Sequence, residues 1–155
     1  MMKQQYSIQQ ILLADDDTDH AVLFEKIIKR QFPHVNTSHV ADGEQLIQFL
    51  HINPVDLLFL DLNMPCKDGY ECLQEIRKDP IIMDLPIIVY SSSAQLSDIQ
   101  RSFINRADFY LVKPFIADHL KTAFKMILSV NWKNNPPIRQ HYFINNRFVP
   151  YTASV

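Results

Sequence analysis

The stretch that decides the fold is LFLDLNMPCKDG, residues 58–69. It joins the end of an apolar run, Val55 to Leu60, to one aspartate and a loop that contains proline and glycine. A near-continuous apolar run is typical of a strand covered on both faces in a parallel sheet. We therefore predict a buried strand that carries Asp61 at its carboxyl end. We expect Gly69 to take a left-handed backbone conformation after Met64-Pro65.

Short apolar runs alternate with amphipathic segments on both sides of this stretch. The predicted strands cover residues 8–14, 36–40, 55–60, 87–90 and 109–112. The predicted helices cover residues 19–32, 43–50, 70–78, 97–106 and 116–130. Such alternation with right-handed crossovers predicts an α/β fold, a doubly wound five-stranded parallel sheet with helices on both faces. Ligands bind beyond the carboxyl ends of the strands in these sheets.

Composition narrows the class of protein. The chain has 155 residues, 47% of them apolar, a net charge of -2 and a pI near 6.3. These values suit one compact domain with a short appendage, and they disfavour a nucleic-acid binder, which needs a basic surface. No run is long enough for a signal peptide or membrane span, so we expect a cytoplasmic protein. Cys66 and Cys72 are expected to be unpaired thiols, and the six histidines show no zinc-like spacing.

The last 25 residues, 131–155, follow a different pattern. Asn134-Asn135-Pro136-Pro137 breaks the helical periodicity, and two apolar runs then flank Asn145-Asn146. This arrangement indicates a β-hairpin, although Asn-Asn is a weaker turn signal than Asn-Gly. The hairpin could pack on its own domain or pair with a neighbouring copy. We favour packing, because its aromatic side chains need burial.

Chemistry-bearing residues follow four of the predicted strands. Asp15-Asp16-Asp17 follows the first, Asp61 the third, Ser91-Ser92-Ser93 the fourth and Lys113 the fifth. Clustered carboxylates without histidine or cysteine favour Mg²⁺, which usually takes one or two carboxylates and shares its shell with a phosphate. A carboxylate in that setting can act as a phosphoryl nucleophile. A lysine and a hydroxyl beside it would neutralise the charge of the transferred group.

Each of these features also has an ordinary structural explanation. The aspartates after the first strand could simply cap the following helix. The serines alone would be read as a turn, and Lys113 alone as a solvated surface residue. A site is predicted because all four strand ends agree.

These residues resemble the receiver domain of bacterial response regulators, from about Gln9 to Val130. The stretch 61–69 fits the family's D-x-x-M-P-x-x-x-G phosphoacceptor loop, and it stands between an Asp-Asp pair and a later Lys-Pro pair. The resemblance implies a flavodoxin-like strand order, 2-1-3-4-5. It implies a receiver domain over 8–130 and a C-terminal extension over 131–155, with no output domain.

The resemblance also assigns a metal site. Asp15 and Asp16 match the acidic pair that holds Mg²⁺, and Asp61 matches the phosphoacceptor, which also contacts the metal. The backbone carbonyl of Asn63 would complete the protein ligands.

Further matches concern the switch. Ser91 matches the switch hydroxyl, Lys113 the family lysine and Tyr110 the switch aromatic, for which an ordinary strand tyrosine is an equal alternative. The bond before Pro114 is expected to be cis. One departure is Arg106, which stands where the family often has glycine.

The resemblance implies that a histidine kinase or histidine phosphotransfer protein donates a phosphoryl group to Asp61. The chain would then catalyse only its own phosphorylation and dephosphorylation, the latter within minutes, because small polar residues, Asn63 and Ser93, flank the path of water. The output would be contact with a protein target through the fourth helix, fifth strand and fifth helix, in a monomer or weak homodimer.

Two alternatives stay open. A haloacid-dehalogenase-type phosphohydrolase has a D-x-D-x-T motif, which Asp15-x-Asp17 nearly fits, but Thr18 comes one place early and the late acidic pair is missing. The other alternative is an interaction module that works without phosphorylation.

Overall fold

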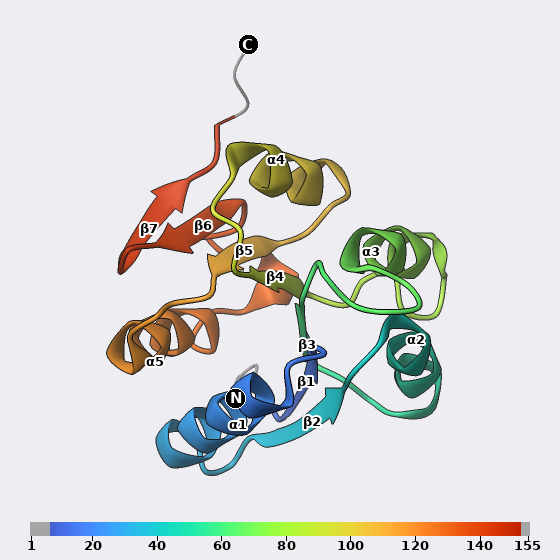
Figure 1. The fold of residues 1–155 in the computed structure, drawn as a ribbon, viewed down its shortest axis with the longest axis horizontal. Helices are drawn as coiled ribbons and strands as arrows, with labels where there is room; N and C mark the ends of the chain where they lie inside the picture. Colours follow the sequence, from blue (N-terminus) through green and yellow to red (C-terminus); the bar gives the residue numbers. More distant parts are fainter. Residues whose placement is uncertain (1–6, 153–155) are drawn as a thin grey trace, which may run out of the picture.

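A computed structural model describes residues 7–152, which form a seven-stranded sheet in the order β2-β1-β3-β4-β5-β6-β7 (Figure 1). The strands are β1 (Gln10–Ala14), β2 (Asn36–Val40), β3 (Leu57–Leu60), β4 (Ile87–Ser91), β5 (Phe109–Val112), β6 (His141–Ile144) and β7 (Arg147–Pro150). Neighbouring strands are parallel from β2 to β6, and β7 runs antiparallel to β6. The predicted order 2-1-3-4-5 is confirmed, and two further strands extend the sheet.

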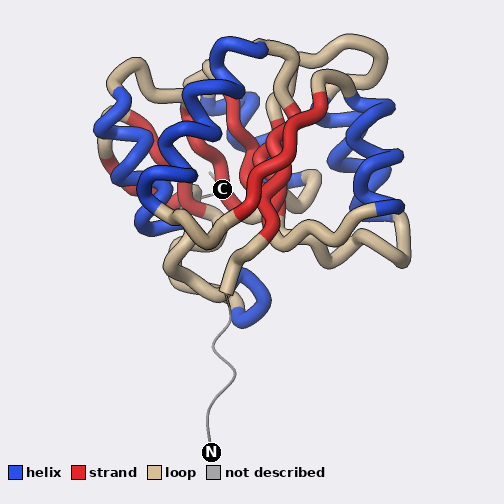
Figure 2. The backbone as a smooth tube through the Cα atoms, turned by 90° about the horizontal axis from the view of Figure 1, so that it is seen from below, coloured by secondary structure: helices blue, strands red, loops and turns tan. Residues whose placement is uncertain are grey.

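Helices cover both faces of this sheet (Figures 1 and 2). They are α1 (Thr18–Gln31), α2 (Gly43–Ile52), α3 (Gly69–Lys78), α4 (Leu96–Ile104) and α5 (Ala117–Ile127), followed by the short 3-10 helix η1 (Trp132–Asn134). One apolar core lies beneath α1 and α5, and a second lies beneath α2, α3 and α4. None of the helices in the described part of the chain is long and apolar enough to cross a membrane.

Alternation along β3 explains why the sheet needs both helical layers. Leu57 and Phe59 belong to the α1–α5 core, whereas Leu58 and Leu60 belong to the α2–α4 core. Successive strand side chains point to opposite faces, so an all-apolar strand is stable only when both faces are covered. All four side chains are fully buried, and β3 therefore anchors Asp61 at the end of a rigid strand.

Gly69 does not have the left-handed conformation that we predicted. No glycine in the described chain has a positive φ; Cys66, at φ 68°, takes the left-handed position in this loop. Gly69 instead begins α3, where an added Cβ would lie 2.4 Å from the Asp61 carbonyl oxygen and 2.6 Å from Leu62 Cα. Glycine is needed here because the start of α3 packs directly against the backbone that carries Asp61.

The predicted helix 97–106 ends earlier than expected. Helix α4 stops at Ile104, and Arg106 has φ 67°. The Ala107 amide donates to the Ser102 carbonyl at 3.0 Å, a hydrogen bond that closes the helix through a left-handed residue. Arg106 thus occupies a position that glycine would occupy with less strain.

The tail forms the predicted hairpin and packs on its own sheet. Asn145 and Asn146 have φ values of 50° and 60°, as a two-residue type I′ turn requires. Strand β6 pairs with β5, where Tyr142 lies opposite Tyr110 and Phe143 opposite Leu111. This pairing confirms intramolecular packing, and it covers the edge of β5 that would otherwise be free.

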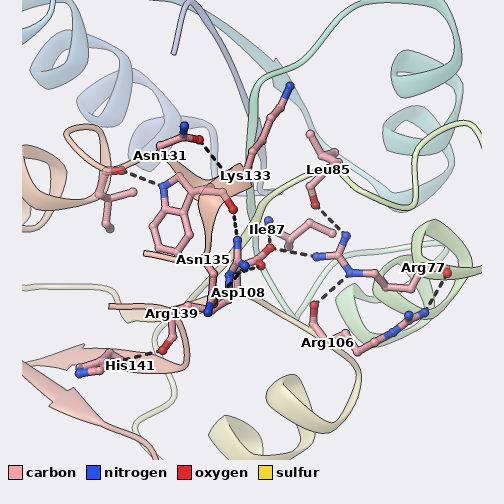
Figure 3. Close-up of polar contacts among 12 residues, drawn as sticks. Arg77, Leu85, Ile87, Arg106, Asp108, Asn131, Lys133, Asn135, Arg139 and His141 are labelled. Carbon is pink, nitrogen blue, oxygen red and sulfur yellow. Dashed lines mark hydrogen bonds and ion pairs between the residues drawn. The ribbon is translucent and has the colours of Figure 1, made fainter. Parts of the chain in front are cut away.

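Ionic contacts fasten the start of the tail to the body of the domain (Figure 3). Asp108, just before β5, lies 3.1 Å from Arg139 Nε through Oδ1 and accepts a hydrogen bond from Arg77 at 3.0 Å through Oδ2. Arg77 also donates to the carbonyls of Met83 and Leu85 at 2.8 and 2.7 Å. Arg77 is largely buried, and these hydrogen bonds satisfy its guanidinium group. We therefore expect this junction to be rigid.

Candidate functional site

Four adjacent strands bring the predicted residues together at the carboxyl edge of the sheet. Asp15 follows β1, Asp61 follows β3, Ser91 ends β4 and Lys113 follows β5. Backbone hydrogen bonds hold these ends in register: the Asp61 amide donates to the Ala14 carbonyl at 2.9 Å, and the Lys113 amide donates to the Ser91 carbonyl at 2.7 Å. The site is therefore placed by the sheet rather than by flexible loops.

Three carboxylates converge at this edge. Asp15, Asp16 and Asp61 each place one carboxylate oxygen within 4.8 Å of the others. Asp15 is completely buried and Asp61 is 5% exposed, whereas Asp16 faces solvent. Backbone amides orient two of them, because the Asp17 amide donates to Asp15 Oδ1 at 3.0 Å and the Asn63 amide to Asp61 Oδ1 at 3.3 Å. An oxygen-only set that opens to solvent on one side is the kind of site a hard divalent cation prefers.

Lys113 bridges the two buried acids. Its Nζ lies 2.8 Å from Asp15 Oδ2 and 3.3 Å from Asp61 Oδ2. Burial works to lower the pKa of Lys113, but the hydrogen bond to Asp15 and the charge of Asp61 outweigh it, and the net pKa is raised. The ammonium therefore stays charged beside Asp61 at physiological pH.

Asp61 has a perturbed acidity. Burial raises the pKa of this carboxyl to about 6; Lys113 opposes the shift and the negative charge of Asp15 adds to it. One ammonium is insufficient to neutralise two buried carboxylates and Asp16 beside them. Excess negative charge of this kind is relieved by protonation or by a bound cation.

The two predicted switch residues are linked through the loop after β4. Ser91 is fully buried, and its Oγ accepts a hydrogen bond from the Ser93 amide at 3.1 Å. The Tyr110 hydroxyl donates to the Ser93 carbonyl at 2.9 Å, and the Ser93 hydroxyl donates to Asp98 Oδ2 at 2.6 Å. The Tyr110 ring is fully buried. Movement of this loop must therefore disturb both β5 and the first turn of α4.

The prediction of a cis peptide bond before Pro114 is wrong. No cis peptide bond occurs in residues 7–152, so the Lys113–Pro114 bond is trans. The trans isomer is the intrinsically favoured form of an X–Pro bond, by about 0.5–1 kcal/mol.

Three residues near the site were not singled out from the sequence. His39 Nε2 lies 2.6 Å from the carbonyl oxygen of Asp15. His20 contacts the hydroxyl of Tyr90 through Nε2, and the Tyr90 ring lies 5.3 Å from Lys113 Nζ. Burial, followed by the Lys113 charge, lowers the pKa of His20. Pairing the first two predicted strands in register, with His39 opposite Leu13, is the one sequence signal that would have found His39.

Known proteins with related sequences include regulatory proteins, response regulators and a chemotaxis protein. The sequence matches the response regulator receiver domain over residues 11–125. It is 26% identical over 134 residues to the probable methanogenesis regulatory protein FilR2 of Methanothrix harundinacea, covering 81% of this chain and 86% of that one. It is 29% identical over 117 residues to the chemotaxis protein CheY of Pseudomonas aeruginosa, covering 76% and 94%. Several other relatives are longer: the chain spans about half of the heme response regulator HssR of Staphylococcus haemolyticus.

Solved structures with this fold include metal-bound receiver domains. The phosphorylated cyanobacterial phytochrome response regulator RcpA superposes with a TM-score of 0.72 at 28% identity, covering 78% of this chain and 91% of that one. The Mn²⁺-bound response regulator Rcp1 gives 0.72 at 25% identity, covering 79% and 96%. The receiver domain of the Pseudomonas aeruginosa sensor histidine kinase PA1611, with magnesium in its active-site cleft, gives 0.67 at 25%, covering 80% and 100%. With its matching fold and strand-end chemistry, this chain belongs to the response regulator receiver domain family.

Proposed function

We propose that this chain accepts a phosphoryl group from phosphohistidine onto Asp61, in a reaction that depends on Mg²⁺, and so switches a protein-interaction surface. The observation that carries the proposal is the shared contact of Lys113 Nζ with Asp15 and Asp61 beside a third carboxylate, Asp16. Placing three acids and a lysine together at the rim of a sheet serves no packing purpose. Such a cluster is suited to binding an anionic group together with a cation.

The acidic cluster fits a magnesium ion. Asp15, Asp16 and Asp61 would hold it, with the backbone carbonyl of Asn63 as a further predicted ligand. When bound, the ion neutralises the charge that builds up on the transferred phosphoryl oxygens. The chain's own residues meanwhile exclude bulk water from Asp15, hold Asp61 in place and supply a fixed positive charge at Lys113.

Phosphoryl transfer itself requires one bond to form and one to break. An Asp61 carboxylate oxygen forms a bond to phosphorus, and the phosphorus–nitrogen bond of the donor phosphohistidine breaks. The donor imidazole leaves with its electron pair and takes up a proton. Ionised Asp61 is the nucleophile, and Lys113 pairs with the oxygens of the acyl phosphate that results.

The donor would be a histidine kinase or a histidine phosphotransfer protein, and the chain would catalyse only its own phosphorylation and dephosphorylation. Ser91 would engage the acyl phosphate, and Tyr110 and α4 would respond through the Ser93 carbonyl and Asp98. The downstream surface would include α4 and β5, in a monomer or a weak homodimer.

The test is acetyl phosphate treatment with Mg²⁺ followed by mass spectrometry. Wild-type protein is expected to gain one phosphoryl group on Asp61, and Asp61→Asn or chelation of the metal is expected to abolish the gain. Asp17→Asn is the matched control, because asparagine caps α1 as well as aspartate does. Failure of wild-type Asp61 to accept the group would favour an interaction module that works without phosphorylation. Turnover of small phosphate esters would favour the phosphohydrolase alternative.

A further inference from the structure

The hairpin (β6 and β7, residues 141–150) occupies part of the surface that we expected to carry the output. Strand β5 pairs with β4 on one side and with β6 on the other, so its edge is closed by the chain's own tail. A target protein cannot reach the edge of β5 in this arrangement. The way the hairpin is held therefore bears on how the domain signals.

The two faces of the hairpin make different contacts. On the α5 face, Phe143 is 1% exposed and packs against Phe148, with ring centroids 4.9 Å apart, in the same core as Trp132. On the α4 face, Tyr142 and Tyr151 pack against the other core and stay only partly buried. The α5 face is thus a deeply buried anchor, and the α4 face is a shallower contact that can open at lower cost.

The α4-face contact encloses the predicted switch aromatic. Tyr142 lies beside Tyr110 in the parallel register of β5 and β6, on the same face of the sheet. Tyr151 stacks on Phe103 of α4, with ring centroids 5.0 Å apart and planes 29° apart. The Tyr110 ring has no exposed surface, and its hydroxyl donates a hydrogen bond to the Ser93 carbonyl.

A continuous set of contacts thus joins the phosphoacceptor site to the hairpin. Ser91 ends β4 beside Lys113. Ser93 is hydrogen-bonded to both Tyr110 and Asp98 of α4. Tyr110 in turn lies beside Tyr142 of the hairpin, and Phe103 of α4 stacks on Tyr151, which directly follows the hairpin. If loop 91–95 moves toward Asp61, the contacts of Tyr142 and Tyr151 must rearrange, because a close-packed core does not deform continuously.

We propose that Tyr142 and Tyr151 form an aromatic latch, which holds Tyr110 and α4 in the unphosphorylated arrangement and is loosened when Asp61 is phosphorylated. The latch rests on the proposed function, because it regulates that same site. By thermodynamic linkage the effect is reciprocal: phosphorylation weakens the α4-face contacts of the hairpin, and weakening those contacts favours phosphorylation. Loosening the latch would expose Tyr110 and α4 to a target, while Phe143 keeps the hairpin attached to the sheet.

The first measurement is hydrogen exchange on the full chain, with and without acetyl phosphate and Mg²⁺. Amides of residues 141–149 are expected to exchange at least threefold faster in the phosphorylated protein. Asp61→Asn treated in the same way is expected to show no change, which separates phosphorylation from an effect of the reagents.

The second measurement is the rate at which acetyl phosphate labels Asp61 in latch variants. Tyr142→Ala is expected to raise the labelling rate about fivefold, because a larger fraction of the protein then adopts the arrangement that accepts the phosphoryl group. Tyr142→Phe, which keeps the ring, is expected to label at the wild-type rate. Tyr151→Ala removes the stacking contact with Phe103 of α4 and is also expected to raise the labelling rate. The fluorescence of buried Trp132 reports whether each variant is folded.

The outcomes separate the two proposals. Absence of label on wild-type Asp61 would overturn the proposed function and the latch with it. Labelling of Asp61 without faster exchange in the hairpin would overturn the latch alone. Labelling rates at or below wild type in folded Tyr142→Ala or Tyr151→Ala would do the same, because a contact that only stabilises the fold would not hold phosphorylation back.

Discussion

Replacing Asp61 by asparagine is expected to stabilise the metal-free protein at neutral pH. Burial raises the pKa of Asp61 to about 6, from a usual value of 3.8. At pH values between these two pKa values, the folded state binds more protons than the unfolded state. Stability therefore falls as the pH rises through this window and stays at the lower level above it. Asparagine has nearly the same shape and no charge, so the variant avoids this loss.

The size of the stability gain follows from the same shift in the pKa of Asp61. Moving a carboxyl pKa from 3.8 to about 6 corresponds to roughly 3 kcal/mol between the two protonation states. The advantage of Asp61→Asn should be small near pH 4, grow between pH 4 and 6, and reach about 2–3 kcal/mol above pH 7. Lys113 keeps its contact with Asp15 in the variant, so no buried cation is left unpaired.

Urea denaturation with chelator, from pH 4.5 to 8, would measure the difference. Trp132, the only tryptophan, is 1% exposed and supplies the fluorescence signal. Mg²⁺ at a hundred times its Kd should stabilise wild type by about 2.7 kcal/mol and the variant by less. The difference in the free energy of unfolding between the two proteins should therefore become smaller. A stability difference that does not change with pH, or a variant less stable than wild type at pH 7.5 without metal, would refute the reasoning.

Three further predictions concern single residues. Arg106→Gly should have a free energy of unfolding about 0.5–1 kcal/mol higher than Arg106→Ala in urea melts, because both variants lose the hydrogen bond from the Arg106 side chain to the Arg77 carbonyl and only glycine relieves the left-handed backbone. Gly69→Ala should lower it by about 1–3 kcal/mol, since the new methyl would meet the backbone of Asp61 and Leu62; an unchanged melt would contradict that close approach. The acyl phosphate on Asp61 should decay with a half-life of minutes after acetyl phosphate is removed, and persistence for many hours would count against the open path expected for water.

The sequence by itself determined the order of the elements and the chemistry at the strand ends. Strand β3 and the helices that cover it follow from periodicity, because apolar runs and amphipathic segments report burial locally. Asp15, Asp61 and Lys113 could be placed together because parallel strands end at one edge. The hairpin was foreseen from Asn145-Asn146, since its two-residue turn is a local property.

Only the tertiary structure decided what depends on distances between remote residues. The need for glycine at position 69 comes from the backbone it touches, and the pKa of Asp61 comes from burial together with Asp15 and Lys113. The place of the hairpin on β5, with Tyr142 beside Tyr110, has no local sequence signal. Periodicity shows that a side chain is buried but not against what, and partners are set by how the strands come together in space.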